Sequence, residues 1–138
     1  MSVYIQGFGN ISIQNTFGQQ GLPEPIWYNE PYVRCIDPDF KNYVSPNEAR
    51  RMSKLIKRAI ASAKEAISVS GIEMPDAIIS GTGLGCIEET EKFLTAMIDN
   101  DEKFLQPTYF IQSTHNTISS QIAINLKCHG HNNTFVHG

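Results

Sequence analysis

The amino-acid sequence predicts an α/β fold in a single domain of 138 residues. Apolar, β-branched segments alternate with segments whose apolar residues recur every three or four positions, which gives the order strand, helix, strand, helix, strand. A glycine-rich run joins one of these strands to the helix that follows it. Hydrophobic residues make up 41% of the chain, an ordinary value for a globular protein, and the length leaves room for one core.

The charge balance and the cysteines narrow the class of protein. The chain has 11 basic and 14 acidic residues. A nucleic-acid-binding surface usually needs a basic excess or a basic face, so this balance argues against a nucleic-acid partner. No apolar run is long enough for a membrane-spanning helix, and the first residues lack the basic and apolar regions of a signal peptide. Three widely spaced cysteines, without a signal peptide, favour a reduced, cytoplasmic protein. We expect neither a nucleic acid nor a membrane among its partners.

The N-terminal third is expected to hold two short strands and then a long loop. Residues 3–5 are apolar and β-branched, Gly9-Asn10 is a turn signal, and residues 11–13 alternate apolar with polar side chains as a strand does. From Gly18 to Pro46 prolines stand among aromatic side chains. We favour an ordered surface loop pinned by these aromatics over a binding loop.

The clearest helix signal is the run from Ser45 to Glu48. Ser45 can cap a helix, Pro46 suits its first position, and Glu48 stands three residues after the cap. The spacing predicts one helix from Pro46 to Ser70 that stops at Gly71. Its apolar face comprises Met52, Leu55, Ile56, Ala59, Ile60, Ala63 and Ile67. Its basic cluster comprises Arg50, Arg51, Lys54, Lys57 and Arg58, for which we favour a solvated face over docking of an acidic protein.

The rest of the chain is expected to alternate strands and helices. The expected elements are a buried strand at 77–80, a glycine turn at 81–86, a helix at 87–100, an extended segment at 107–112, a helix from Thr114 or Asn116 to about Lys127, and a strand at 134–136.

The glycine turn and the histidines are the first candidates for chemistry. The run Gly-Thr-Gly-Leu-Gly between strand and helix is similar to the entry of a dinucleotide site, but Cys86 stands where that pattern needs a sixth-position glycine. We therefore favour a tight turn over a nucleotide site. His129 and His131 flank one glycine near Cys128, yet no carboxylate or second thiol has zinc-like spacing, so we expect no metal.

Cys86 and the following glutamates are the other candidates. The helix N-terminus could lower the pKa of the Cys86 thiol, but no base is placed by spacing, so we favour a small buried residue. Glu88, Glu89 and Glu91 cluster in the first turns of the same helix, where the helix dipole explains them without catalysis.

Three stretches, in this order and spacing, resemble the N-terminal part of a β-ketoacyl-acyl-carrier-protein synthase, a condensing enzyme with the thiolase-like fold. They are residues 49–54, residues 79–85 with 88–90, and residues 112–117 with 119–124 and 130–132. The match spans about Val44 to Val136, and residues 3–9 resemble the family's opening strand and glycine turn. The resemblance implies the N-terminal half of a thiolase-like fold, with a mixed sheet and packed helices.

The resemblance also implies an activity, the decarboxylative condensation of acyl and malonyl thioesters on carrier protein in fatty-acid or polyketide-type synthesis. In the family a cysteine takes the acyl chain and two histidines act on the malonyl unit. The cysteine directly follows the strand that matches residues 134–137, so its position falls just past Gly138. We therefore expect this chain to be truncated before the nucleophile, to hold no catalytic, cofactor-binding or metal-binding residue, and to be inactive alone.

Departures from the family pattern keep an alternative open. Cys86 stands where the family usually has glycine, His131 replaces a common proline, and residues 135–138 differ from the usual small-residue approach to the nucleophile. The alternative is a non-catalytic relative of the chain-length-factor type, or a module that binds a carrier protein or a ketosynthase. A nucleotide-binding α/β domain is a third reading, against which Cys86 argues.

The resemblance finally implies partners and pocket residues. The expected partners are acyl carrier protein and a second subunit, in a homodimer or a ketosynthase heterodimer, with residues 134–137 paired antiparallel to their own copy. Leu84 matches a loop position that helps to set the depth of the acyl pocket. Ile111 and Thr114 match positions that reach this pocket across the dimer interface.

Overall fold

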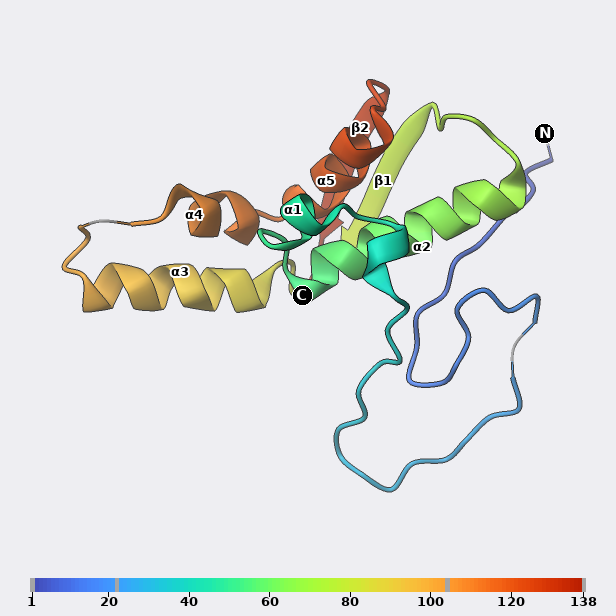
Figure 1. Ribbon diagram of the computed structural model, residues 1–138, viewed down its shortest axis with the longest axis horizontal. Helices are drawn as coiled ribbons and strands as arrows, with labels where there is room; N and C mark the ends of the chain where they lie inside the picture. The colour runs from blue at the N-terminus through green and yellow to red at the C-terminus, as the bar shows by residue number, and fades with distance from the viewer. Residues whose placement is uncertain (1, 22, 104, 138) are drawn as a thin grey trace.

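A parallel pair of strands with two helices stacked over it forms the centre of the molecule (Figure 1). The structure is a computed structural model that describes residues 2–21, 23–103 and 105–137. Its elements are η1 (Phe40–Asn42), α1 (Pro46–Ala49), α2 (Lys54–Ser70), β1 (Ala77–Thr82), α3 (Ile87–Asp99), α4 (Pro107–Ser113), α5 (Thr117–Leu126) and β2 (His131–Val136). The α/β class is confirmed.

β1 and β2 are joined by the long crossover that contains α3, α4 and α5, as a parallel pair requires. Their register runs from Ala77 opposite His131 to Thr82 opposite Val136, so both strands end at the same edge. α5 contacts both strands and α2 packs on α5. The predicted strand at 77–80 is present, but of its side chains only that of Ile78 is buried, so this strand is less covered than expected.

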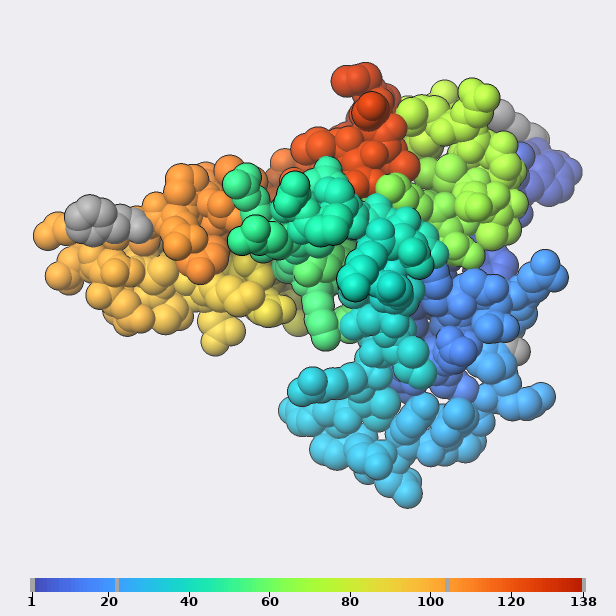
Figure 2. All heavy atoms as spheres, viewed as in Figure 1, coloured from blue at the N-terminus to red at the C-terminus, as the bar shows by residue number. Residues whose placement is uncertain are grey.

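The core lies between α2 and its neighbours. Ile56 and Ile60 are fully buried and pack with Val44, and Met52 and Ile122 border this cluster. Figure 2 shows that the α3–α4 pair (yellow to orange) projects away from this centre. A tilted aromatic contact within the pair, with the Phe93 and Phe110 ring centroids 5.6 Å apart, holds its two helices together.

The helix predicted over 46–70 is interrupted, which corrects the sequence expectation. α1 begins with the expected capping box of Ser45 and Glu48 but ends at Ala49. Ser53 then caps a new helix, because its hydroxyl accepts a hydrogen bond from the Ile56 amide. Serine competes for backbone donors in this way, so it favours a helix start over a helix interior. The predicted stop is confirmed, since Gly71 caps α2 in the left-handed conformation with φ 71°.

The expected strands at 3–5 and 11–13 are absent, since residues 2–21 and 23–39 contain neither helix nor strand. The described sheet consists of β1 and β2, and neither strand pairs with this segment. The segment lies instead along α2, where a Cβ on Gly7 or Gly9 would overlap the carbonyl oxygens of Ala66 and Ser62. Glycine is therefore needed at both positions for the close approach.

Some aromatic side chains of the proline-rich loop hold it in place, as expected, since the Tyr43 ring packs edge-to-face on Phe17 with the centroids 5.5 Å apart. The Tyr28 hydroxyl donates to the Ile13 carbonyl, and the Ile36 amide donates to the Ser12 carbonyl. Trp27 and Tyr32 are more than 90% exposed, so the expectation that the aromatics pin this loop is wrong for these two residues.

The segment predicted as extended at 107–112 is the helix α4. Pro107 occupies its first turn, which suits the fixed φ of proline. The other predicted helices agree with α3 and α5; α5 starts after Asn116 and ends at Leu126, and Lys127 caps it with a φ of 56°. Among the described residues, no helix combines the length and the apolarity needed to cross a membrane.

Candidate functional site

The candidate site lies where β1 and β2 end. In parallel α/β sheets, ligands bind beyond the carboxyl ends of the strands. Here the loop after Thr82, the last residue of β2 and the start of α5 meet. The Gly85 amide donates to the Thr82 hydroxyl at 2.9 Å, and the His137 amide donates to the Thr82 carbonyl at 3.3 Å. Thr82 therefore ties the glycine loop to the end of β2.

The glycine loop lies against the segment before α5. Gly85 has a φ of 59°, and a Cβ built there would collide with the ring of His115. The expectation of a tight turn that needs glycine is thus confirmed at Gly85. Gly81 and Gly83 do not have positive φ, so the loop does not need glycine for its conformation at these two positions.

A chain of polar side chains fixes α5 to both strands beneath this loop. The hydroxyl of Ser119, which is fully buried, lies 2.7 Å from Asn132 Oδ1 and 2.7 Å from Thr134 Oγ1. Thr134 also contacts the Ser80 hydroxyl on β1 at 3.3 Å. The Asn132 carboxamide returns a hydrogen bond to the Ser119 carbonyl at 3.0 Å. The orientation of α5 toward the strands therefore depends on these side chains, which the sequence analysis missed.

The three predicted pocket residues lie around this edge but do not share one cavity. Thr114 and Thr117 both donate to the Ile111 carbonyl, so the end of α4 is fixed to the start of α5. Thr114 lines the strand-end hollow, a cavity of about 650 Å³ that Asn132 and Thr134 also line. Ile111 lines a different hollow of about 870 Å³. Leu84 borders neither hollow and is 72% exposed in the glycine loop.

The Cys86 thiol is not an activated nucleophile. Cys86 is buried at the N-cap of α3, as favoured from sequence. Burial raises the pKa of its thiol, and the negative charge of Glu89 raises it further. The pKa of the Cys86 thiol is therefore raised, and not lowered as its place at a helix N-terminus alone would suggest. The Cys128 thiol is also buried and donates to the Pro75 carbonyl at 3.3 Å.

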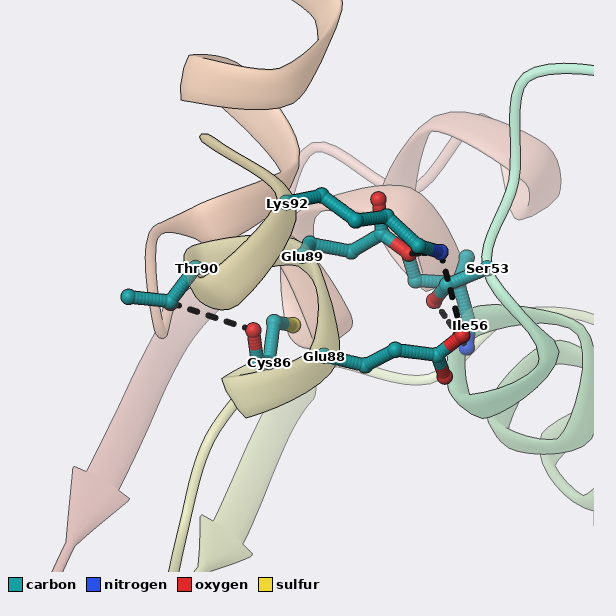
Figure 3. A network of polar contacts seen from close by, with 7 residues as sticks. All are labelled: Ser53, Ile56, Cys86, Glu88, Glu89, Thr90 and Lys92. Carbon is teal, nitrogen blue, oxygen red and sulfur yellow. Dashed lines mark hydrogen bonds and ion pairs between the residues drawn. The ribbon is translucent and has the colours of Figure 1, made fainter. Parts of the chain in front are cut away.

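The acidic residues at the start of α3 form ion pairs in addition to their favourable interaction with the helix dipole. Glu89 is buried, and Lys92 Nζ lies 2.9 Å from its carboxylate and 3.0 Å from that of Glu88 (Figure 3). These two carboxylates raise the pKa of Lys92, Glu89 through the stronger hydrogen bond. Thr90 donates to the carbonyls of Cys86 and Ser113, which joins α3 to the end of α4.

The basic cluster divides into two parts with different surroundings. Arg58 binds Asp37 with two hydrogen bonds, and Lys54 lies 3.5 Å from the same carboxylate. The Arg58 guanidinium holds the pKa of Asp37 below its usual range. Arg50 and Arg51 are exposed and take part in no ion pair among the described residues. The cluster is therefore a solvated face only in part, because Asp37 binds two of its members.

The histidines do not form a metal centre in the described part of the chain. Within residues 2–21, 23–103 and 105–137, no three His, Cys, Asp or Glu side chains are grouped to hold an ion. His115 instead packs beside the glycine loop, and His131 begins β2.

Comparison with known proteins assigns most of the chain to one family. The family model of the beta-ketoacyl synthase N-terminal domain matches residues 23–136. A search of curated proteins gave no significant match. The family match begins within the proline-rich loop and ends at the last residue of β2, so it includes every element that positions the candidate site.

Proposed function

Because the chain belongs to the β-ketoacyl synthase family through its N-terminal domain, we propose that it forms the N-terminal portion of a protein that condenses acyl and malonyl thioesters on carrier protein. The chemistry of the proposal is decarboxylative carbon–carbon bond formation in fatty-acid or polyketide-type synthesis. The chain contributes the framework of the site and no nucleophile of its own. The three free cysteines fit a reducing compartment such as the cytoplasm.

One observation carries the proposal. The glycine loop, the start of α5 and the end of β2 converge at one edge of the parallel pair. Hydrogen bonds from Ser119 to Asn132 and Thr134 hold α5 against β2 next to this edge. A group attached after β2 would enter the site from this edge, where the family places its nucleophile. Neither buried thiol suits the role of the nucleophile, because the pKa of Cys86 is raised and the Cys128 thiol donates a hydrogen bond to a backbone carbonyl.

Within the proposal, Leu84 lines the acyl pocket of the complete site, and Ile111 and Thr114 reach this pocket across the dimer interface. Leu84 projects from a loop held between Thr82 and His115, where a larger side chain would take up pocket volume. The test is Leu84→Phe in a full-length ketosynthase that contains this domain. The expected result is a shorter product, and an unchanged product-length profile would remove Leu84 from the pocket. Leu94→Phe, on the exposed surface of α3, is the matched control.

Arg50 and Arg51 favour a second candidate function, a module that binds a carrier protein. These side chains are exposed and free of acidic partners among the described residues, so they complement a partner with an acidic surface. Fluorescence anisotropy of a labelled acyl carrier protein, titrated with this chain, tests the interaction. Arg50→Glu with Arg51→Glu should weaken binding at least about tenfold and make the remaining binding less sensitive to salt, whereas Lys57→Glu is the control on the same basic cluster.

The subunit partner is proposed from the exposed edge of β2. Phe135 and Val136 are 61% and 41% exposed, and the described sheet leaves the backbone donors and acceptors on one edge of β2 without a strand partner. Such an edge pairs readily with another strand. We propose that β2 pairs with its own copy, or with β2 of a related ketosynthase subunit.

A further inference from the structure

We propose that His115 is a positioning residue for the choice of acyl chain length, because its ring holds the glycine loop and so fixes where Leu84 projects. The inference rests on the proposed function, in which Leu84 lines the acyl pocket, and it gives a role to a side chain that is not among the pocket residues. Three observations support it: the contact of His115 with Gly85, the anchors on either side of Leu84, and the fixed turn that carries His115.

The His115 ring packs directly on the backbone of Gly85. A Cβ built on Gly85 would overlap the Nδ1, Cε1 and Cγ atoms of this ring, so the ring occupies the space of the missing side chain. Gly85 also has a φ of 59°, a conformation that residues with a side chain rarely adopt. Glycine is therefore needed here both for the turn of the loop and for the contact with His115.

Leu84 has fixed points on both sides in the chain. The Gly85 amide donates to the Thr82 hydroxyl at 2.9 Å, and a Cβ on Gly83 would lie 3.7 Å from the His137 carbonyl oxygen at the end of β2. Leu84 itself is 72% exposed, so the packing of its own side chain does not hold it in place. The direction of this side chain therefore depends on the loop backbone, where Leu84 stands between two glycines.

The turn between α4 and α5 carries His115 in a fixed position. The hydroxyls of Thr114 and Thr117 both donate to the Ile111 carbonyl, and the Thr117 amide donates to the Thr114 carbonyl at 3.1 Å. Thr117 is only 4% exposed, which leaves this turn little freedom to move. Ser119 then holds α5 against β2 through its hydrogen bonds. His115 thus connects the glycine loop to the strands through α5.

Loss of the His115 ring would leave the glycine loop with one side-chain anchor, the hydrogen bond between Gly85 and Thr82. Glycine has more backbone freedom than any other residue, so a loop with two glycines beside Leu84 becomes mobile when a contact is removed. The Leu84 side chain would then sample several positions. In the complete site, longer acyl chains would enter past Leu84, because it would no longer fill a fixed volume.

The positioning role is tested on this chain by ¹⁵N relaxation. In the wild type the amides of Gly83, Leu84 and Gly85 should have order parameters of about 0.85, as rigid backbone does, and in His115→Ala these should fall below about 0.6. His115→Phe keeps a flat ring and should restore the rigid values. His129→Ala is the matched control and should change none of them, since this exposed histidine precedes β2 at the opposite edge of the strands.

The consequence for chain length is tested in a full-length ketosynthase that contains this domain. His115→Ala should broaden the product profile and raise the ratio of longer to wild-type-length products severalfold. His115→Phe should return the wild-type profile, because the ring and not its nitrogens makes the contact with Gly85. His129→Ala should leave the profile unchanged.

Order parameters that stay rigid in His115→Ala, or that fall equally in His115→Phe, would overturn the role of the ring. A loop that becomes mobile while the product profile stays unchanged would overturn the link to chain length. A full-length wild type without condensing activity would contradict the proposed function and the link to chain length together. The relaxation measurement does not depend on activity, so failure of the proposed function is distinguishable from failure of the positioning role.

Discussion

Removing the Ser119 hydroxyl should destabilise the fold by about 2 kcal/mol, because this hydroxyl connects α5 to β2. Ser119 is fully buried, and its Oγ lies 2.7 Å from both Asn132 Oδ1 and Thr134 Oγ1. Each such bond contributes roughly 1 kcal/mol, and a buried partner left without one costs roughly 1–3 kcal/mol. Asn132 can turn to water because it is exposed, and Thr134 keeps its contact with Ser80, so the lower end of this range applies.

The assay is equilibrium unfolding in urea, read by circular dichroism, of Ser119→Ala and the control Ser120→Ala. Ser120 is the next residue of α5, is half-buried, and has no side-chain hydrogen bond among the described residues. The control should change stability by about 0.5 kcal/mol or less, chiefly through helix propensity. A double-mutant cycle of Ser119→Ala with Thr134→Val should give a coupling of about 1 kcal/mol. If both serine variants unfold at the same urea concentration, the Ser119 hydroxyl does not stabilise the contact between α5 and β2.

Three further predictions concern the ion pair, the cysteines and the strand edge. Arg58 lowers the pKa of Asp37 below its ordinary 3.8, so this ion pair stabilises the fold above that pH, and its contribution is lost as pH falls through the lower pKa of the folded state. The difference in unfolding free energy between wild type and Arg58→Gln should therefore shrink between about pH 5 and pH 2. A difference that stays constant with pH would contradict the assignment. The buried Cys86 should react with a disulfide reagent far more slowly than the half-buried Cys35 in the native state, and equal rates that unfolding does not change would disprove the burial argument. Wild-type chain should sediment as a dimer or larger species at tens of micromolar, and Phe135→Lys should shift it to monomer; a monomeric wild type, or a variant that associates equally, would exclude the strand edge as the contact.

The sequence predicted those elements whose signals are local. Gly71 ended α2 as expected, and the strand, glycine turn and helix from residue 77 to residue 99 appeared in the predicted order. The errors occurred where two local signals compete or where the partner is distant. Ser53 could continue or restart a helix, and the cap prevailed. Residues 3–5 have strand composition, but the structure gives them no strand to pair with.

The candidate site was predicted in outline and not in its connections. The motifs identified the glycine loop and residues near the start of α5 as parts of the site, and the structure brings Gly85 of that loop against His115. The Ser119–Thr134 contact depends on the parallel register of β1 and β2, which no local pattern encodes. Which basic residues lack an acidic partner also depends on tertiary contacts. Asp37, which binds Arg58, lies 21 residues away in the chain, so the sequence did not distinguish Arg58 from Arg50 and Arg51.

The proposed function is tested most directly by intact mass spectrometry of the chain after incubation with acyl-loaded carrier protein. We predict that the carrier protein binds through Arg50 and Arg51, and that the acyl group stays on the carrier while the mass of this chain is unchanged. A mass increase equal to one acyl group, abolished by Cys86→Ala or Cys128→Ala, would show that the chain holds its own nucleophile and that the proposed function is wrong.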